Sequence, residues 1–177
     1  KEVLFLFKNL KELSQIIYFI DVIISHSFLS SKNNYVRPNF EKDNGLEIMN
    51  GRHPVVENSL ESNNKSFIPN DCILEKEATW LMTGPNMAGK STFLRQTAII
   101  VIMAQIGCYI PADKADLSIV DKIFTRVGAS DDLSKGQSTF MTEMVETARI
   151  LNGSTPNSLV ILDEVGRGTS ARDGMAL

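Results

Sequence analysis

Apolar residues recur at alternating spacings of four and three near the start of the chain. This spacing places them on one face of an α-helix, so we predict a helix over residues 1 to about 30. Such a face has to pack against other helices, which makes this a packing helix rather than a site. Gln15 and Asp21 interrupt the apolar run, so we expect no membrane span. The stripe consists of Leu6, Leu10, Leu13, Ile17, Ile20 and Ile24.

The polar run Ser30–Asn34 ends this pattern and predicts a linker. The next part of the chain carries only short apolar groups, and we expect Val55-Val56 and Cys72–Leu74 to form short strands. Residues 58–66 are polar and are predicted to form a surface loop. His53 precedes a proline, which favours an extended backbone at that position, and we assign it a structural role.

The pattern is more regular from Ala78 onward, where apolar runs alternate with helical periodicity. Strands that alternate with helices predict an α/β fold with a parallel sheet. In chain order we expect a strand at Thr79–Thr83, a helix at Ser91–Ile106, a strand at Ser118–Val127, a loop at 128–137, a helix at Ser138–Leu151, a turn at 152–157 and a strand at Ser158–Leu162.

The composition is that of one globular domain, with 177 residues of which 43% are hydrophobic and 22% charged. The net charge of −3 predicts no nucleic-acid binding by this chain alone, so any such contact would come from another part of the protein. Cys72 and Cys108 lie far apart without metal-ligand spacing, which fits a reducing compartment. The chain starts without methionine, and we expect both ends to be truncated.

A glycine-rich segment at residues 84–91 fits the phosphate-loop pattern G-x-x-x-x-G-K-[ST] in full. Backbone N–H groups of such a loop surround phosphates, helped by the positive end of the following helix. Gly84 and Gly89 allow the tight backbone path, and Lys90 places a cation on the β- and γ-phosphates. The Ser91 hydroxyl is a ligand for Mg²⁺. The segment therefore predicts that the chain binds ATP with Mg²⁺.

Two acidic residues follow the apolar run Ser158–Leu162 directly. Open α/β sheets bind ligands at the carboxyl ends of their strands, which is where Asp163 and Glu164 are predicted to lie. We expect Asp163 to hold Mg²⁺, directly or through water. We expect Glu164 to orient and polarise the attacking water, so the chain would hydrolyse ATP.

Small and hydroxyl residues between these two motifs open a helix near Ser138. The free N–H groups of such a helix end can receive an anion, and this end is suited to close over a nucleotide held by a second subunit. The polar segment Gly166–Gly174 follows the two acids. It is placed to sense the γ-phosphate or to meet a partner subunit.

Together these motifs resemble the MutS family of DNA mismatch repair ATPases over almost the whole chain and in the same order. Ala88 departs from the pattern, because the family usually has glycine there. The phosphate-loop pattern leaves that position free, so we expect nucleotide binding to survive. The matching blocks are Asn34–Pro38, Gly51–Glu57, Thr83–Thr92, Phe124–Leu133, Ser138–Met141 and Asp163–Ser170.

The resemblance implies a phosphate-loop NTPase of the ABC-ATPase type, with an incomplete parallel or mixed sheet, flanking helices and a preceding helical segment. Residues 1–33 would be the end of a helical lever and 34–50 a linker. Residues 51–177 would be the first part of the ATPase domain. The family's mismatch-reading domain and clamp would lie upstream.

The resemblance also assigns site residues. Phe67 and Ile68 match the position at which the family stacks an aromatic ring on adenine, and Asn86 matches an asparagine near the γ-phosphate and the active-site water. Ser138 matches a serine that reaches the nucleotide across the dimer interface. The implied ATP-binding residues of the loop are Gly84, Pro85, Asn86, Met87, Ala88, Gly89, Lys90, Ser91 and Thr92.

The same resemblance implies an ATP-driven clamp on mismatched double-stranded DNA, a homodimer or heterodimer, and a MutL-type partner. It implies a protein of the bacterial cytoplasm, associated with the nucleoid, with no membrane contact. ATP hydrolysis would be coupled to the binding of mismatched DNA.

Three other interpretations stay open. Leu133–Gln137 resembles the signature of transporter ATPases, but Ser91 and Ser134 are only 43 positions apart, too few for the helical subdomain of that class. A second MutS-like branch, linked to recombination and ribosomes, usually has a different loop. A non-catalytic nucleotide-sensing dimerisation module would have no need of Glu164.

Overall fold

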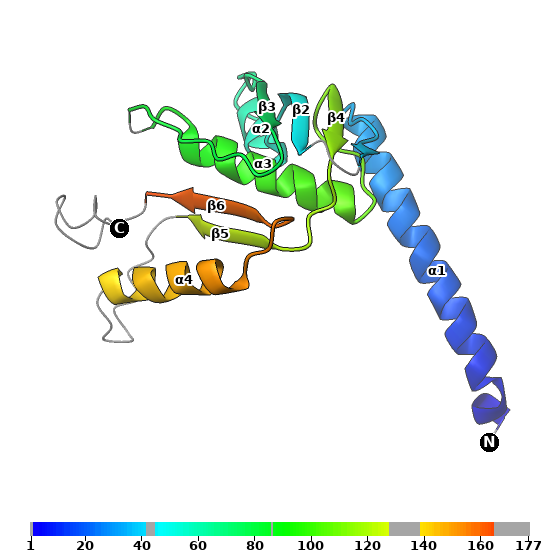
Figure 1. Cartoon of the computed structure of the whole chain (residues 1–177). Helices are drawn as coiled ribbons and strands as arrows, with labels where there is room; N and C mark the ends of the chain where they lie inside the picture. The colour runs from blue at the N-terminus through cyan, green and yellow to red at the C-terminus, as the bar shows by residue number, and fades with distance from the viewer. Residues whose placement is uncertain (1, 42–44, 86, 128–138, 165–177) are drawn as a thin grey trace.

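The computed structural model describes residues 2–41, 45–85, 87–127 and 139–164. Four predictions from the sequence lie outside these residues: the loop at 128–137, the roles of Asn86 and Ser138, and the polar segment Gly166–Gly174. The described chain forms two small sheets and four helices, a mixed α/β arrangement (Figure 1). The predicted α/β class is therefore confirmed.

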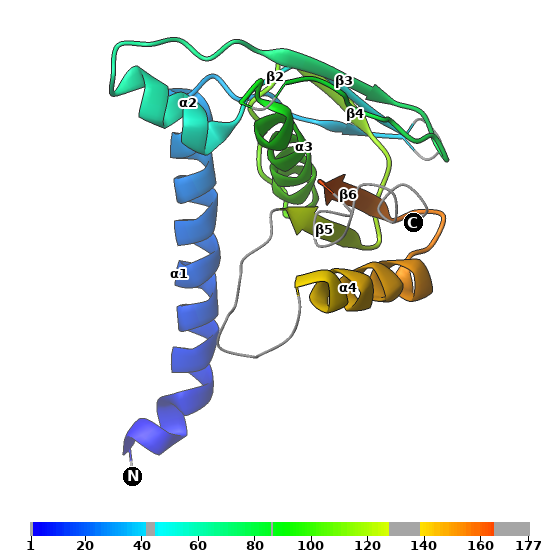
Figure 2. The ribbon, with the colours of Figure 1, turned by 90° about the vertical axis from the view of Figure 1, so that its left-hand side faces the viewer.

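Helix α1 (Glu2–Lys32) extends away from the rest of the structure, as Figures 1 and 2 show. The predicted helix is confirmed, but it continues through part of the expected linker. Ser30 Oγ donates to the carbonyl of His26 at 2.7 Å, and the Asn33 side chain donates to that of Leu29 at 3.0 Å. Both bonds connect a side chain to the carbonyl four residues earlier, near the end of the helix. The chain then turns at Asn34, whose φ is 52°.

Helix α1 exposes apolar side chains along its described length, with Tyr18 and Phe28 each 70% exposed. By length and composition alone, Phe7–Lys32 is long and apolar enough to cross a membrane. The sequence analysis held that polar residues leave no apolar stretch long enough to cross a membrane. The length of this helix shows that argument to be wrong. The same test is passed by core helices of larger soluble proteins, and the absence of a membrane stays a prediction.

The first sheet has the strand order β1-β4-β2-β3. Strand β2 runs antiparallel to β3 and β4, whereas β1 runs parallel to β4. The predicted strand at Cys72–Leu74 is confirmed within β3. The strands are β1 (Asn39–Phe40), β2 (Leu46–Gly51), β3 (Asn70–Leu74) and β4 (Lys114–Leu117).

The predicted strand at Val55-Val56 is wrong, because both residues belong to helix α2 (Pro54–Glu61). His53 has the extended backbone expected before proline, with φ −90° and ψ 109°, and its side chain accepts from the N–H of Val56. A cap followed by proline at the first helical position is a strong helix start. The predicted loop at 58–66 begins only after this helix ends.

The second sheet consists of β5 (Ile123–Val127) and β6 (Leu159–Asp163), which pair in parallel as expected. Helix α3 (Lys90–Gln105) lies on one face and helix α4 (Thr139–Gly153) on the other (Figure 1). Burial alternates along β6: Leu159, Ile161 and Asp163 are buried, while the residues between them are exposed. Leu159 and Ile161 join the core formed with α3, so Asp163 lies on the α3 side of the strand.

The strand predicted at Ser118–Val127 is only half correct, because residues 118–122 lie outside β5. The Gln105 side chain explains the difference. It accepts from the N–H of Val120 at 2.6 Å and donates to the carbonyl of Val120 at 2.9 Å. Both backbone groups of Val120 are thereby bound to a helix instead of a neighbouring strand.

The strand predicted at Thr79–Thr83 is wrong for this structure, in which these residues form neither helix nor strand. Leu81 is 89% exposed, and Trp80 stacks on Phe93 of α3 with ring centroids 6.4 Å apart. An apolar run forms a strand only when neighbouring strands accept its backbone hydrogen bonds. Within the described residues, β5 and β6 pair only with each other.

Candidate nucleotide site

The glycine-rich segment leads directly into helix α3, which begins at Lys90. Gly89 is the N-cap in a left-handed conformation with φ 90°, and it brings no side chain that could cap the helix. The first N–H groups of a helix need an acceptor, and they carry the positive end of its dipole. An anion such as a phosphate is well suited to this end.

Lys90 folds back over the segment that precedes its own helix. Its ammonium donates to the carbonyl oxygens of Gly84 at 2.5 Å and Pro85 at 2.9 Å. The positive charge therefore lies beside the loop backbone, where it is still exposed to solvent. Met87 has a φ of 66° and a fully exposed side chain, which turns away from the loop. This arrangement concentrates positive potential at the amino end of α3.

The two acidic residues lie at the carboxyl end of β6, as expected. Asp163 is 6% exposed, whereas Glu164 is exposed and has a left-handed backbone with φ 56°. Val127, the last residue of β5, pairs with Asp163 in the register of the sheet. In Figure 1 the carboxyl ends of β5 and β6 lie on the same side of the molecule as the amino ends of α3 and α4.

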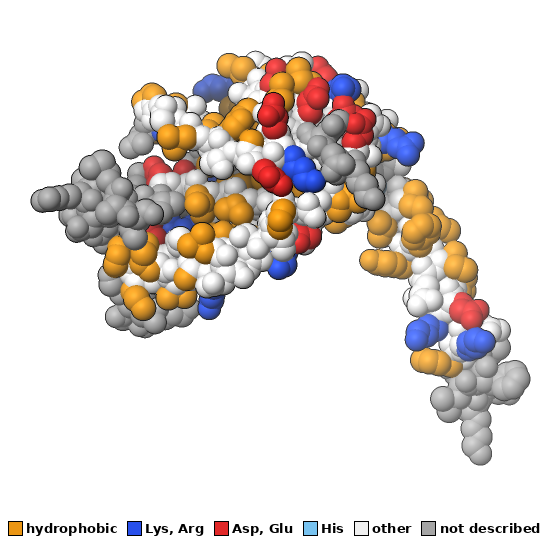
Figure 3. All heavy atoms as spheres, viewed as in Figure 1, with side chains coloured by type: hydrophobic (Ala, Val, Ile, Leu, Met, Phe, Trp, Pro, Cys, Tyr) orange, Lys and Arg blue, Asp and Glu red, His pale blue; other side chains and the backbone are white. Residues whose placement is uncertain are grey.

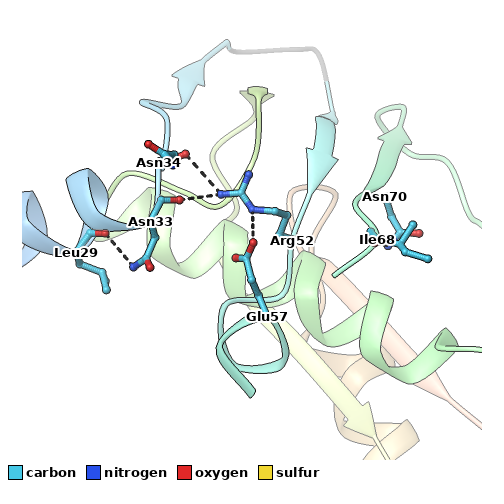
Figure 4. A network of polar contacts seen from close by, with 7 residues as sticks. All are labelled: Leu29, Asn33, Asn34, Arg52, Glu57, Ile68 and Asn70. Atoms are coloured by element: carbon cyan, nitrogen blue, oxygen red, sulfur yellow. Dashed lines mark hydrogen bonds and ion pairs between the residues drawn. The ribbon is translucent and has the colours of Figure 1, made fainter. Parts of the chain in front are cut away.

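Phe67 and Ile68 lie in the connection between α2 and β3. Phe67 is partly buried and Ile68 is 80% exposed. Figure 4 shows Ile68 beside Asn70, whose side-chain amide donates to the Ile68 carbonyl at 3.0 Å. The contact of Phe67 and Ile68 with adenine stays a prediction.

The donor set can be tested against Mg²⁺. Among the described residues, no group of three or more His, Cys, Asp or Glu side chains could hold a metal ion. Magnesium is commonly held by one or two carboxylates together with substrate phosphates and waters. One carboxylate, Asp163, and one hydroxyl, Ser91, fit that requirement when a nucleotide supplies the other oxygens.

Sequence reasoning did not identify the role of Arg52. Its Nη2 donates to the carbonyl of Asn33 at 3.0 Å, and its Nε forms an ion pair with Glu57 Oε1 at 2.8 Å. Figure 4 shows the guanidinium between the end of α1 and the first turn of α2. The carbonyls that end a helix attract cations, so Arg52 attaches α1 to the body of the structure.

His53, next in the chain, has the structural role expected for it. Burial lowers its pKa, and the positive charge of Arg95 acts in the same direction. The ring is therefore held neutral, which leaves Nδ1 as the acceptor for the N–H of Val56 at 3.4 Å.

A buried ion pair between β5 and α4 was also missed. Arg126 is 7% exposed, and its Nη1 lies 3.3 Å from Oε1 of Glu143, which is 1% exposed. Its Nε lies 3.3 Å from Oε2 of Glu146. An arginine within an apolar strand, and two glutamates three apart on a helix, are signals that the sequence offers for such a pair.

The surface in Figure 3 has no basic face toward the viewer. Acidic and basic side chains lie interspersed over the sheets, and apolar side chains run along α1. The absence of DNA binding by the chain alone stays a prediction from the net charge of −3.

The fold and the site together define an α/β domain with a glycine-capped helix and a buried carboxylate at one edge of a parallel strand pair. Residues 80–177 match the family model MutS domain V. This match covers more than half of the chain, which therefore belongs to the MutS family.

Individual relatives are similar over nearly the whole chain. The DNA mismatch repair protein MutS of Rickettsia bellii (strain RML369-C) is 60% identical over 159 residues, 89% of this chain and 18% of that protein. The proteins of the same name from Rickettsia canadensis (strain McKiel) and Rickettsia rickettsii (strain Sheila Smith) are 59% and 58% identical over the same shares. The chain thus spans 18% of the length of these relatives.

Proposed function

We propose that this chain is the ATP-binding and ATP-hydrolysing part of a DNA mismatch repair protein, built as a phosphate-loop NTPase of the ABC-ATPase type. One observation carries the proposal. The amino end of α3 has a glycine cap and Lys90, and it lies on the same side of the molecule as buried Asp163. A positive helix end opposite a carboxylate suits a phosphate chain with its divalent cation.

In this proposal the loop residues from Gly84 to Thr92 bind the phosphates through backbone N–H groups. Lys90 exchanges its two carbonyl partners for phosphate oxygens, because a charged acceptor binds an ammonium more strongly than a carbonyl does. Ser91 and Asp163 would hold Mg²⁺, whose chemistry when bound is to neutralise charge on the phosphates.

Hydrolysis requires a water molecule aligned with the terminal phosphate. Glu164 follows the buried end of β6, and its side chain is exposed at the same edge of the sheet. We assign Glu164 the orientation of the water, with Asn86 as a second polar group near the γ-phosphate. Phe67 and Ile68 would contact adenine, and Ser138 would reach the nucleotide bound by a second copy.

For the whole protein we propose ATP-dependent binding of mismatched duplex DNA through parts outside this chain. The partners would be a second copy of the same chain and a MutL-type protein in the bacterial cytoplasm. Residues 1–33 would connect the nucleotide site to the DNA-binding parts, and Arg52 would fasten that connection at its base. The names of the Rickettsia relatives support the mismatch repair assignment.

The test is ATP binding by the full-length protein, measured by titration calorimetry with Mg²⁺. Lys90→Ala should weaken ATP binding by about tenfold or more, because one charge-assisted contact to phosphate is lost. Lys11→Ala, on the exposed surface of α1, is the matched control and should bind as the parent does. A parent protein that binds no ATP at about 1 mM would overturn the proposal.

A further inference from the structure

Arg126 is a charged residue in an apolar setting that the proposed chemistry does not use. It occupies the fourth position of β5 and is 7% exposed, with Glu143 and Glu146 of α4 both 3.3 Å from its guanidinium. Removing a charge from water is costly, and apolar residues of similar size often stabilise a fold as well as a buried ion pair does. Stability alone therefore does not account for this cluster.

The position of the cluster is informative. Arg126 stands one residue before the end of β5, whose last residue pairs with Asp163. Glu143 is the fifth residue of α4, so the ion pair lies near the amino end of that helix. The pair therefore joins the amino end of α4 to the strand end beside the candidate magnesium ligand.

The far end of α4 is held separately. The Lys122 ammonium donates to the carbonyl of Gly153 at 2.8 Å, at the carboxyl end of the helix. The Phe124 ring also packs close to Gly153, where an added Cβ would lie 3.1 Å from Cζ. The two ends of α4 are thus held by different contacts, from Arg126 at one end and from Lys122 and Phe124 at the other, which allows each end to be perturbed without the other.

The charges also matter for what the amino end of α4 can bind. Carboxylates near a helix amino end offset the positive potential of its dipole. The first turn of α4 carries no acidic residue, and Glu143 and Glu146 farther along the helix are paired with Arg126, so the positive potential of the amino end is not offset. The start of α4 is next to Ser138 in the chain.

We propose that Arg126 is a positioning residue, which uses Glu143 to hold the amino end of α4 in a fixed place relative to Asp163 for nucleotide hydrolysis. The inference rests on the proposed ATPase function. It adds that hydrolysis depends on the alignment of α4, whereas binding of the nucleotide at the α3 loop does not.

The test uses the full-length protein with Arg126→Met and Glu143→Met together, an apolar pair of similar volume that leaves no uncompensated buried charge. We expect kcat to fall by about 10- to 100-fold, since a misplacement of about 1 Å can have an effect of that size. The ATP dissociation constant should stay within about threefold of the parent value, because the α3 loop is unchanged. Arg126→Lys, which retains one ion pair, should recover part of the lost kcat.

The matched control is Lys122→Met, which releases the opposite end of the same helix. It should leave kcat unchanged if alignment of the amino end is what matters. Unchanged kcat in the double variant, or an equal loss in Lys122→Met, would overturn the proposal. A fall in ATP affinity together with kcat would also count against it, because it would indicate general damage to the site.

A second measurement separates this proposal from the assignment of ATPase activity. Amide hydrogen exchange without nucleotide should accelerate at residues 140–146 in the double variant but not at residues 150–153. If the parent lacks ATPase activity, the proposed function fails while the exchange result still tests the attachment of α4. Equal exchange at both ends would overturn the structural half of the proposal.

Discussion

The Nη2 of Arg52 lies 3.0 Å from the backbone oxygen of Asn33, immediately after the last turn of α1. The first residue after β2 thereby holds the base of a helix whose described length is otherwise exposed. Glu57 fixes the guanidinium from the other side at 2.8 Å. Arg52 thus attaches the end of α1 to the α/β body, and Cys108, whose Sγ lies 3.4 Å from the ring nitrogens of His26, contacts the helix at a second point.

Replacement of Arg52 by alanine should loosen this attachment. The variant loses charge-assisted bonds to helix-end carbonyls and leaves Glu57, 18% exposed, without this cation. We expect local opening at residues 33–36 to become easier by about 1–3 kcal/mol. Hydrogen exchange of these amides in the full-length protein measures the change. Glu57→Gln, which keeps the bonds from Arg52 to α1, should have a smaller effect, and an equal effect would argue against the role of Arg52.

The cap of α2 should make that helix sensitive to acid. The folded-state pKa of His53 is lowered, first by burial and then by Arg95, so the unfolded chain takes up the proton first. The contribution of His53 to the stability of α2 is therefore fully present above the pKa of about 6.5 that the ring has in the unfolded chain. This contribution is lost as the pH falls through that value toward the lower pKa of the folded state.

Hydrogen exchange at residues 57–61, corrected for the intrinsic pH dependence, should show easier opening at pH about 5.5 than at about 7.5. His53→Asn retains a capping acceptor without a titrating ring, so its opening free energy should be nearly constant over this range. The same pH dependence in both proteins would contradict the assignment.

Gly51 is a position where packing leaves no room for a side chain. An added Cβ would lie 2.8 Å from Nε2 of Gln96, 3.0 Å from Cγ2 of Ile48 and 3.2 Å from the carbonyl oxygen of Asn70. Gln96 is 1% exposed within α3 and has little space to move. Gly51→Ala should destabilise the contact between β2 and α3 by about 1–3 kcal/mol.

The measurement is hydrogen exchange in β2 and β3 of the full-length protein. Adding Gln96→Ala to Gly51→Ala removes the nearest atom, so the two changes together should cost less than the sum of their separate effects. If the destabilisation in the double variant equals the sum of the two single effects, the strain in Gly51→Ala does not come from contact with Gln96.

Local patterns predicted three of the four described helices, α1, α3 and α4, because their periodicities are properties of short segments. The strand at Thr79–Thr83 was wrong because strand formation depends on partners that a local pattern does not contain. The predicted strand at Ser118–Val127 begins only at Ile123, because the side chain of Gln105, distant in the sequence, binds the backbone of Val120. Val55-Val56 became helical through the cap that His53 supplies.

The same distinction applies to the candidate site. Placing Asp163 at a strand end followed from the run of apolar residues before it. The contacts of Arg52 and Arg126 could not be predicted, because each joins segments that only the packing of the fold brings together. The placement of Phe67 and Ile68 beside a nucleotide likewise depends on tertiary contacts and stays a prediction.

Glu164 offers the most direct separation of hydrolysis from nucleotide sensing. If it orients the attacking water, Glu164→Gln should lower the single-turnover rate by about 100- to 10,000-fold while ATP binding is retained, since the amide cannot act as a base. Asp163→Asn should instead weaken the Mg²⁺ dependence of ATP binding, because it removes a metal ligand. Both variants are studied in the full-length protein with radiolabelled ATP. ATP binding is measured with ATP in excess over enzyme, and the single-turnover rate is measured with enzyme in excess over ATP. A normal rate in Glu164→Gln would remove the role assigned to that carboxylate, and the site would then fit a module that binds ATP to drive dimerisation without turnover.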